Sequence, residues 1–139
     1  RQGCPAGPKS GPSPVDRGRP GSKHHVIVDG QGIPLAATLT GGNHNDVTQL
    51  LPLLDKIPAV AGLVGRPRRR PDTLLADRGY DQPHGSGLGI FRYVVGRTIS
   101  WLHDFRRLRI RWERRDDIHE AFLGLAVCLI THRHVQRLC

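Results

Sequence analysis

Two short apolar runs around a glycine-bearing turn place the strongest constraint on the fold. Residues 25–28 and 33–40 are rich in β-branched and other apolar side chains, and residues 29–32 between them read Asp-Gly-Gln-Gly. Strand-forming runs joined by a turn of this composition are typical of a β-hairpin. The sequence therefore predicts an antiparallel pair of strands, against which the other elements must pack.

Three later segments have the spacing of helices. Apolar side chains recur at helical intervals between residues 47 and 54, and Asn45 or Asp46 is a suitable N-cap for that segment. An amphipathic stretch follows at residues 91–105, and a last helix is expected at about residues 117–134, with acidic residues at its start. The chain is therefore expected to be of the α/β class.

A basic loop and a short apolar run lie between the first two predicted helices. Residues 65–71 contain four arginines and two prolines, and the prolines hold the backbone extended. Residues 73–76 are interpreted as a buried strand that places Asp77 at its carboxyl end, where α/β folds commonly hold functional groups. The alternative is that Asp77 only caps the following turn.

The charge balance indicates a polyanionic partner. Lys and Arg number 21 against 12 Asp and Glu, a net charge of +9, which favours nucleic acid over a membrane surface. Residues 90–115 hold eight arginines against two acids, a density suited to phosphate backbones. The residues predicted to contact DNA are Arg92, Arg97, Arg106, Arg107, Arg109 and Arg111.

Aromatic side chains lie among these arginines. Trp101, Phe105 and Trp112 would supply the stacking surface that a basic nucleic-acid site uses. The alternative is a solvated basic helix face with the aromatic rings turned into the core. Both interpretations remain open from the sequence.

Other site types are not favoured. The histidines at 24–25 and 132–134 lack a third ligand at metal-binding spacing, and the glycine run at 85–89 lacks the last glycine of a dinucleotide loop. Three cysteines without a CxxC pair argue against a disulfide framework or zinc ribbon. No run approaches the roughly 18 apolar residues of a membrane span, so no membrane contact and a cytoplasmic location are expected.

The chain is expected to divide at residue 22. Residues 1–22 are rich in glycine and proline without apolar periodicity, and we interpret them as an extended lead-in to a domain of residues 23–139. The sequence contains no methionine, which favours a processed chain or a fragment.

Five segments in this order resemble the DDE transposases of bacterial insertion sequences. They are residues 11–25, 28–35, 41–46, 75–81 and 105–116. The resemblance implies an RNase H-like fold, with a mixed sheet flanked by helices, in which three carboxylates bind two Mg²⁺ ions. It further implies cleavage at the element ends, transfer of the freed 3′ hydroxyl to target DNA, and a nucleoid-associated location.

Only one of the three acids can be carried over to this chain. Asp77 corresponds to the second catalytic and metal-binding acid. The first acid belongs to a strand before the hairpin that is missing here, and Asp29 does not replace it because Asp29 lies in the turn. The signature of arginine, three residues and glutamate reads here as Arg92, three residues and Gly96.

The residues after Asp77 also depart from the pattern. Residues 78–95 alone separate Asp77 from Gly96, where the family normally fits a further strand and helix. Residues 23–139 are therefore expected to be a partial catalytic domain with an incomplete sheet. Mg²⁺ demands near-ideal coordination, so a site with one acid should be inactive.

Two functions remain open from the sequence. The first is a catalytic-domain fragment of an insertion-sequence transposase that is inactive alone. The second is a non-catalytic, basic DNA-binding remnant that binds element ends or joins oligomers of itself or of intact transposase. An upstream reading frame could supply the first acid, but it would not restore glutamate at position 96.

Overall fold

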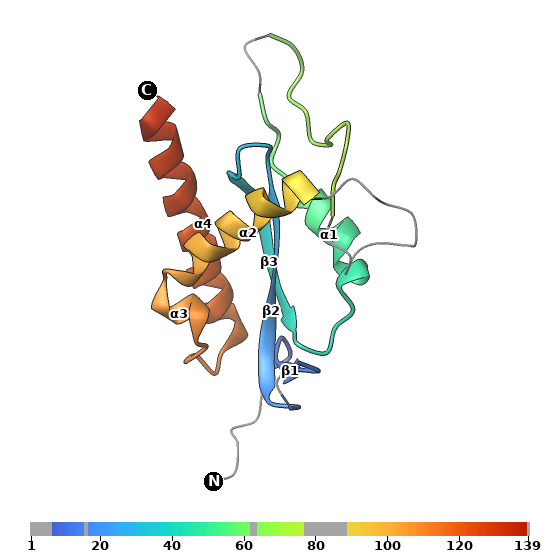
Figure 1. Ribbon diagram of the computed structural model, residues 1–139, viewed down its shortest axis with the longest axis vertical. Helices are drawn as coiled ribbons and strands as arrows, with labels where there is room; N and C mark the ends of the chain where they lie inside the picture. The colour runs from blue at the N-terminus through green and yellow to red at the C-terminus, as the bar shows by residue number, and fades with distance from the viewer. Residues whose placement is uncertain (1–6, 16, 62–63, 77–88, 139) are drawn as a thin grey trace.

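The protein is a mixed α/β structure built on an antiparallel hairpin (Figure 1). The structure is a computed structural model that describes residues 7–15, 17–61, 64–76 and 89–138, and the side chains of residues 89–93 and 138 lie outside that description. The elements are β1 (Gly11–Pro12), β2 (Pro20–Val28), β3 (Pro34–Gly41), the 3₁₀ turn η1 (Asp46–Gln49), α1 (Leu50–Asp55), α2 (Gly89–His103), α3 (Arg106–Arg109) and α4 (Asp116–Leu138).

The predicted hairpin is confirmed. β2 and β3 pair antiparallel, with His24 opposite Leu39, and an irregularity follows Ile27 near the turn. Asp29 closes that turn, because its Oδ1 accepts hydrogen bonds from the backbone N–H groups of residues 31 and 33. Gly32 has a φ of +87°, a left-handed conformation that glycine adopts without strain.

β2 begins earlier than the sequence indicated. It starts at Pro20, and its first two residues pair with β1, so residues on both sides of position 22 belong to one strand. The proposed boundary between a lead-in of residues 1–22 and a domain of residues 23–139 stays a prediction. In the structure, the strand β2 spans the proposed boundary at residue 22.

The predicted strand at residues 73–76 is wrong. These residues have no regular secondary structure, and Leu74 and Leu75 are exposed rather than buried. A short apolar run forms a strand only when another strand pairs with it, and no described strand pairs with this one. The described sheet has the order β1-β2-β3 and is antiparallel throughout, so a mixed sheet is not observed within it.

The three predicted helices are confirmed as α1, α2 and α4. Asn45 is the N-cap of the first one, and its side chain accepts a hydrogen bond from the N–H of Val47. Pro52 has no N–H to donate to the carbonyl of Thr48, which explains why this helix starts as a 3₁₀ turn. The short helix α3 was not predicted, and no described helix is long and apolar enough to cross a membrane.

Two apolar clusters lie on opposite faces of the hairpin. Successive strand residues face opposite sides, so Val26 packs with the α2 and α4 cluster whereas Ile27 packs with α1. The first cluster contains Leu102, Leu108, Leu123, Ala126 and Ile130, and the second contains Ile27, Ala36, Leu53 and Ile57. In Figure 1, α4 and α1 accordingly lie on either side of the hairpin, and α2 crosses it.

Candidate nucleic-acid interface

The helix α3 presents exposed arginines at the surface. Arg106 and Arg109 are exposed, and neither side chain forms a hydrogen bond or ion pair with another residue in the described part of the chain. Leu108 between them is buried in the α2 and α4 cluster. A buried leucine thus anchors a short helix whose charged side chains remain available to an external anion.

Arg107 on the same helix is engaged within the protein. Its Nη1 donates to Oε1 of Glu113 at 2.6 Å, and its guanidinium lies 4.7 Å from the centroid of the Phe122 ring. The side chain is still 60% exposed. Arg107 can therefore contact an external anion, but it does so while it is ion-paired with Glu113.

Arg111 is held inside the structure. Its side chain is 15% exposed and donates to Oγ of Ser22 at 2.5 Å, to the carbonyl of Lys9 at 3.3 Å and to the carbonyl of Glu113 at 3.0 Å. It also forms an ion pair with Asp116. These contacts join the N-terminal segment to the start of α4, so the geometry of Arg111 is that of a structural residue.

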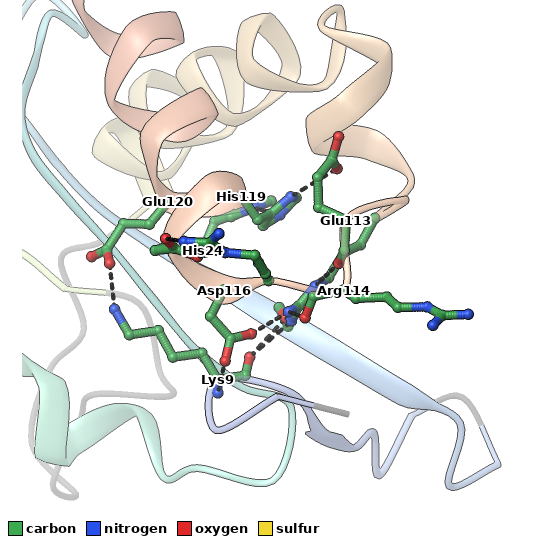
Figure 2. A network of polar contacts seen from close by, with 11 residues as sticks. Lys9, His24, Glu113, Arg114, Asp116, His119 and Glu120 are labelled. Atoms are coloured by element: carbon green, nitrogen blue, oxygen red, sulfur yellow. Dashed lines mark hydrogen bonds and ion pairs between the residues drawn. The ribbon is translucent and has the colours of Figure 1, made fainter. Parts of the chain in front are cut away.

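The carboxylate of Asp116 is the centre of this network (Figure 2). It accepts a hydrogen bond from the backbone N–H of Lys9 at 2.9 Å as well as the ion pair from Arg111. Burial alone would raise the pKa of Asp116, but the Lys9 N–H and the Arg111 guanidinium lower that pKa below its usual value. Lys9 Nζ also forms an ion pair with Glu120 on the next turn of α4. No pattern in the sequence pointed to this role of Lys9.

Two histidines lie beside that network, of which His119 is buried and His24 is half-buried. Nε2 of His24 on β2 is 3.3 Å from Nε2 of His119 on α4, and His119 is 1% exposed. Figure 2 shows His119 between His24 and Glu113, whose Oε2 lies 4.0 Å from His119 Nδ1. Burial, followed by the charge of His119, lowers the pKa of His24 to about 4. Burial also lowers the pKa of His119, so the neutral form of both rings is favoured at pH 7.

The remaining predicted arginines lie on α2. Arg97 donates through Nη2 to the carbonyl of Gln31 at 2.5 Å, and its guanidinium lies 5.0 Å from the Trp101 ring centroid. Arg92 belongs to the first turns of α2, and its side chain lies outside the described residues. Arg97 thus ties α2 to the hairpin turn.

The aromatic residues divide between the two interpretations. Trp101 and Phe105 pack against the α2 and α4 cluster, as the structural alternative expects. Trp112 is 73% exposed and lies between arginines 111 and 114 in the sequence. Only Trp112 of these three rings is placed to stack on an external base.

An open depression beside α3 contains Gly96, the position at which the resemblance predicts a catalytic glutamate. It has a volume of about 440 Å³ and is lined by Gly96, Ile99, Ser100, His103, Asp104 and Arg109. A Cβ atom built on Gly96 meets nothing within 4 Å. The helix face that would carry a side chain at position 96 is therefore open and lies beside a basic residue.

A second cleft was not expected from the sequence. It has a volume of about 730 Å³, and its apolar walls come from the hairpin, the segment that follows α1, and α2, including Ile27, Ile57 and Val94. The exposed arginines of the basic loop at residues 66–70 line the same cleft. The run of arginines in that loop was the signal that could have placed cationic residues here.

The described residues do not fit a divalent metal ion. They contain no group of three His, Cys, Asp or Glu side chains that could hold one. Asp29 uses one carboxylate oxygen to close the hairpin turn, and Gly96 has no ligand atom. Asp77, the predicted second acid, lies outside the described residues.

Comparison with known proteins gives two matches. Residues 3–84 match the family model described as Transposase DDE domain. The chain is also 55% identical, over 151 aligned residues, to a protein of Burkholderia cepacia that is named as the transposase for insertion sequence element IS402. That alignment covers 94% of this chain and 72% of the relative. No solved structure matches the chain.

Proposed function

Because the chain belongs to the Transposase DDE domain family, we propose that it is an insertion-sequence transposase polypeptide that binds DNA through the surface around α3 but does not cleave DNA by itself. The name of the Burkholderia relative supports the assignment to an insertion sequence. DNA is the partner that the family implies.

The exposed arginines of α3 carry the DNA-binding part of the proposal. Arg106 and Arg109 are exposed and have no partner in the described part of the chain, and the exposed ring of Trp112 lies close to them in the sequence. Phosphate contacts by arginine release counterions, and an exposed aromatic ring can stack on an unpaired base. We assign Arg106 and Arg109 to phosphate contacts, with Arg107 as a further contact.

Two of the other predicted arginines have different roles in this proposal. Arg111 supports the interface by holding the N-terminal segment against Asp116, and Arg97 positions α2 on the hairpin turn. Arg92 stays a predicted DNA contact. Mutation of Arg111 should therefore affect stability first and DNA affinity second.

Position 96 carries the second part of the proposal. The resemblance places the third catalytic acid there, and glycine supplies no oxygen for Mg²⁺. Asp77 stays the proposed second acid, within an RNase H-like sheet that is itself a prediction. Since the described residues do not fit the metal, no reaction step is assigned to it.

Loss of cleavage leaves a DNA-binding function. A chain that binds element ends without cutting them would compete with intact transposase for those ends or join its oligomers. This was the second of the two functions left open by the sequence, and it follows from the same basic surface.

Fluorescence anisotropy with a labelled DNA duplex tests the DNA-binding proposal. The double variant Arg106→Ala and Arg109→Ala should weaken binding and reduce the slope of log K against log salt by roughly 2, because each lost phosphate contact removes about one released counterion. Arg133→Ala, an exposed arginine on α4, is the matched control. Equal salt slopes for both variants and the wild type would contradict the assignment.

A further inference from the structure

Glu113 lies between the proposed DNA-binding surface and the interior of the protein. One of its carboxylate oxygens, Oε1, accepts a hydrogen bond from Nη1 of Arg107 at 2.6 Å on the surface side. The other oxygen, Oε2, lies 4.0 Å from Nδ1 of His119 on the inner side (Figure 2). The side chain of Glu113 is 11% exposed, whereas that of Arg107 is 60% exposed. A single carboxylate therefore connects an exposed arginine to a buried histidine.

The inner side of this connection is incomplete. Glu113 Oε2 and His119 Nδ1 are both buried, and neither atom has a hydrogen-bond partner among the residues that the structure describes. A buried polar atom without a partner is costly, because it has lost its hydrogen bonds to water. The distance of 4.0 Å between the two atoms is too long for a hydrogen bond but within the range of an ion pair. The two side chains would therefore gain an interaction if His119 took up a proton.

Neighbouring groups hold Glu113 and Arg107 in place. Arg111 donates from Nε to the backbone carbonyl of Glu113 at 3.0 Å, which fixes the chain between α3 and α4. The guanidinium of Arg107 lies 4.7 Å from the centroid of the Phe122 ring. Both charged groups are thus held in position before any ligand arrives, and the ion pair between them costs little further side-chain entropy.

We propose that Glu113 is a positioning residue that limits the contact of Arg107 with DNA, and that a proton on His119 relieves this limit. The role of Glu113 depends on the proposed DNA binding by the surface around α3. While His119 is neutral, the negative charge of Glu113 acts on Arg107 and offsets part of the positive charge that a phosphate would meet. When His119 is a cation, it shares the carboxylate, and Arg107 presents more of its charge to DNA.

The contact between His24 and His119 accommodates one added proton. A protonated His119 donates from Nε2 to Nε2 of His24 and from Nδ1 to Oε2 of Glu113, while His24 keeps its own proton on Nδ1. Both nitrogens of the His119 ring then have a partner. The link between β2 and α4 is therefore kept while the charge at Glu113 changes.

Charges on several elements act on this histidine pair. The titratable or charged side chains that face it are His25, His103, Arg111, Glu113 and Asp116. Burial, followed by the charge of Arg111, lowers the pKa of His119, and the carboxylates of Glu113 and Asp116 oppose this shift. DNA phosphates beside Arg107 would add a negative potential that favours the proton. DNA binding and proton uptake should therefore strengthen each other.

Fluorescence anisotropy with a labelled duplex at pH 7.5 tests the role of Glu113. Glu113→Gln keeps the size of the side chain but removes its charge, so it should tighten DNA binding by about threefold and steepen the salt slope by up to about 1. Asp55→Asn removes the same charge at an exposed position of α1, on the opposite face of the hairpin, and is the matched control. In an Arg107→Ala background, the effect of Glu113→Gln should fall to that of the control. Circular dichroism should show that all variants keep the helical content of the wild type.

The pH profile of the same assay tests the role of His119. At pH 7.5, Arg107→Ala should weaken binding by about twofold, and at pH 5.5 by at least about fivefold, because the protonated histidine shares Glu113. Exposed histidines also gain charge over this range, but they act on the wild type and on Arg107→Ala alike. In the Glu113→Gln background, the loss caused by Arg107→Ala should be the same at both pH values.

The outcomes separate the role of Glu113 from DNA binding itself. Absence of duplex binding by the wild type would overturn the proposed function and the role of Glu113 together. If the wild type binds but Glu113→Gln changes affinity no more than Asp55→Asn does, the role of Glu113 alone is wrong. The same conclusion follows if the loss caused by Arg107→Ala in the otherwise wild-type chain does not grow as the pH falls.

Discussion

Nε2 of His24 lies 3.3 Å from Nε2 of His119, and this contact joins β2 to α4 across the interior of the protein. One ring donates its N–H to the other ring nitrogen, which requires that the two rings do not both carry a proton on Nε2. Glu113 lies on the other side of His119. The attachment of α4 to the sheet therefore depends on the protonation of this histidine pair, of which His119 is buried and His24 is half-buried.

Acidification should destabilise the fold through this pair. The pKa of His24 falls from 6.5 in the unfolded chain to about 4 in the folded one, so between these values the unfolded state binds more protons. The stabilising contribution is complete above pH 6.5 and is lost as the pH falls toward 4. It amounts to roughly 3 kcal/mol. Urea denaturation between pH 7 and 4 measures it.

His24→Gln is the variant that isolates this effect. It keeps a hydrogen-bonding side chain but cannot titrate, so its free energy of unfolding should fall less steeply over the same pH range. Lowered pKa values of His25 and His119 leave a residual dependence of the same sign. Superimposable pH profiles for the variant and the wild type would show that His24 is not the responsible group.

Arg111 and its neighbour Arg114 should respond differently to the same substitution. Arg111→Gln leaves the buried Asp116 carboxylate without its ion pair and should lower the free energy of unfolding by roughly 3 kcal/mol. Arg114 is exposed, and Arg114→Gln should change the free energy of unfolding by less than about 0.5 kcal/mol. Denaturant melts of both variants test this difference. Equal stabilities would mean that the Arg111 network does not hold the N-terminal segment.

Gly96→Ala should stabilise the protein. Gly96 lies within α2, where glycine is unfavourable, and an added Cβ meets nothing within 4 Å. The expected gain is about 1 kcal/mol in the free energy of unfolding. Thermal denaturation should show a raised Tm. A lowered Tm would mean that the space beside Gly96 is occupied in the folded chain.

Asp29 should act as a turn residue and not as a metal ligand. Asp29→Ala removes the acceptor of two backbone N–H groups and should lower the free energy of unfolding by about 1–2 kcal/mol. Asp29→Asn keeps a side-chain oxygen and should be closer to the wild type. If both variants kept wild-type stability but lost metal binding, Asp29 would belong to the catalytic acids after all.

The local parts of the fold could be predicted because their signals are local. The turn at residues 29–32 and the Asn45 cap depend on neighbouring residues, and both were found where the sequence indicated. The segment at residues 73–76 failed because its apolar run does not specify a partner strand. The same limit applies to Arg111, whose contacts come from residues about 90 to 100 positions earlier in the chain.

A cleavage assay tests the central claim most directly. Purified chain is incubated with supercoiled plasmid DNA and Mg²⁺ or Mn²⁺, beside the Asp77→Ala variant and a duplex-binding control on the same preparation. The absence of glutamate at position 96 predicts that the wild type binds duplex DNA but produces no nicked or linear plasmid. Metal-dependent nicking by the wild type that Asp77→Ala abolishes would show that this chain is a working transposase.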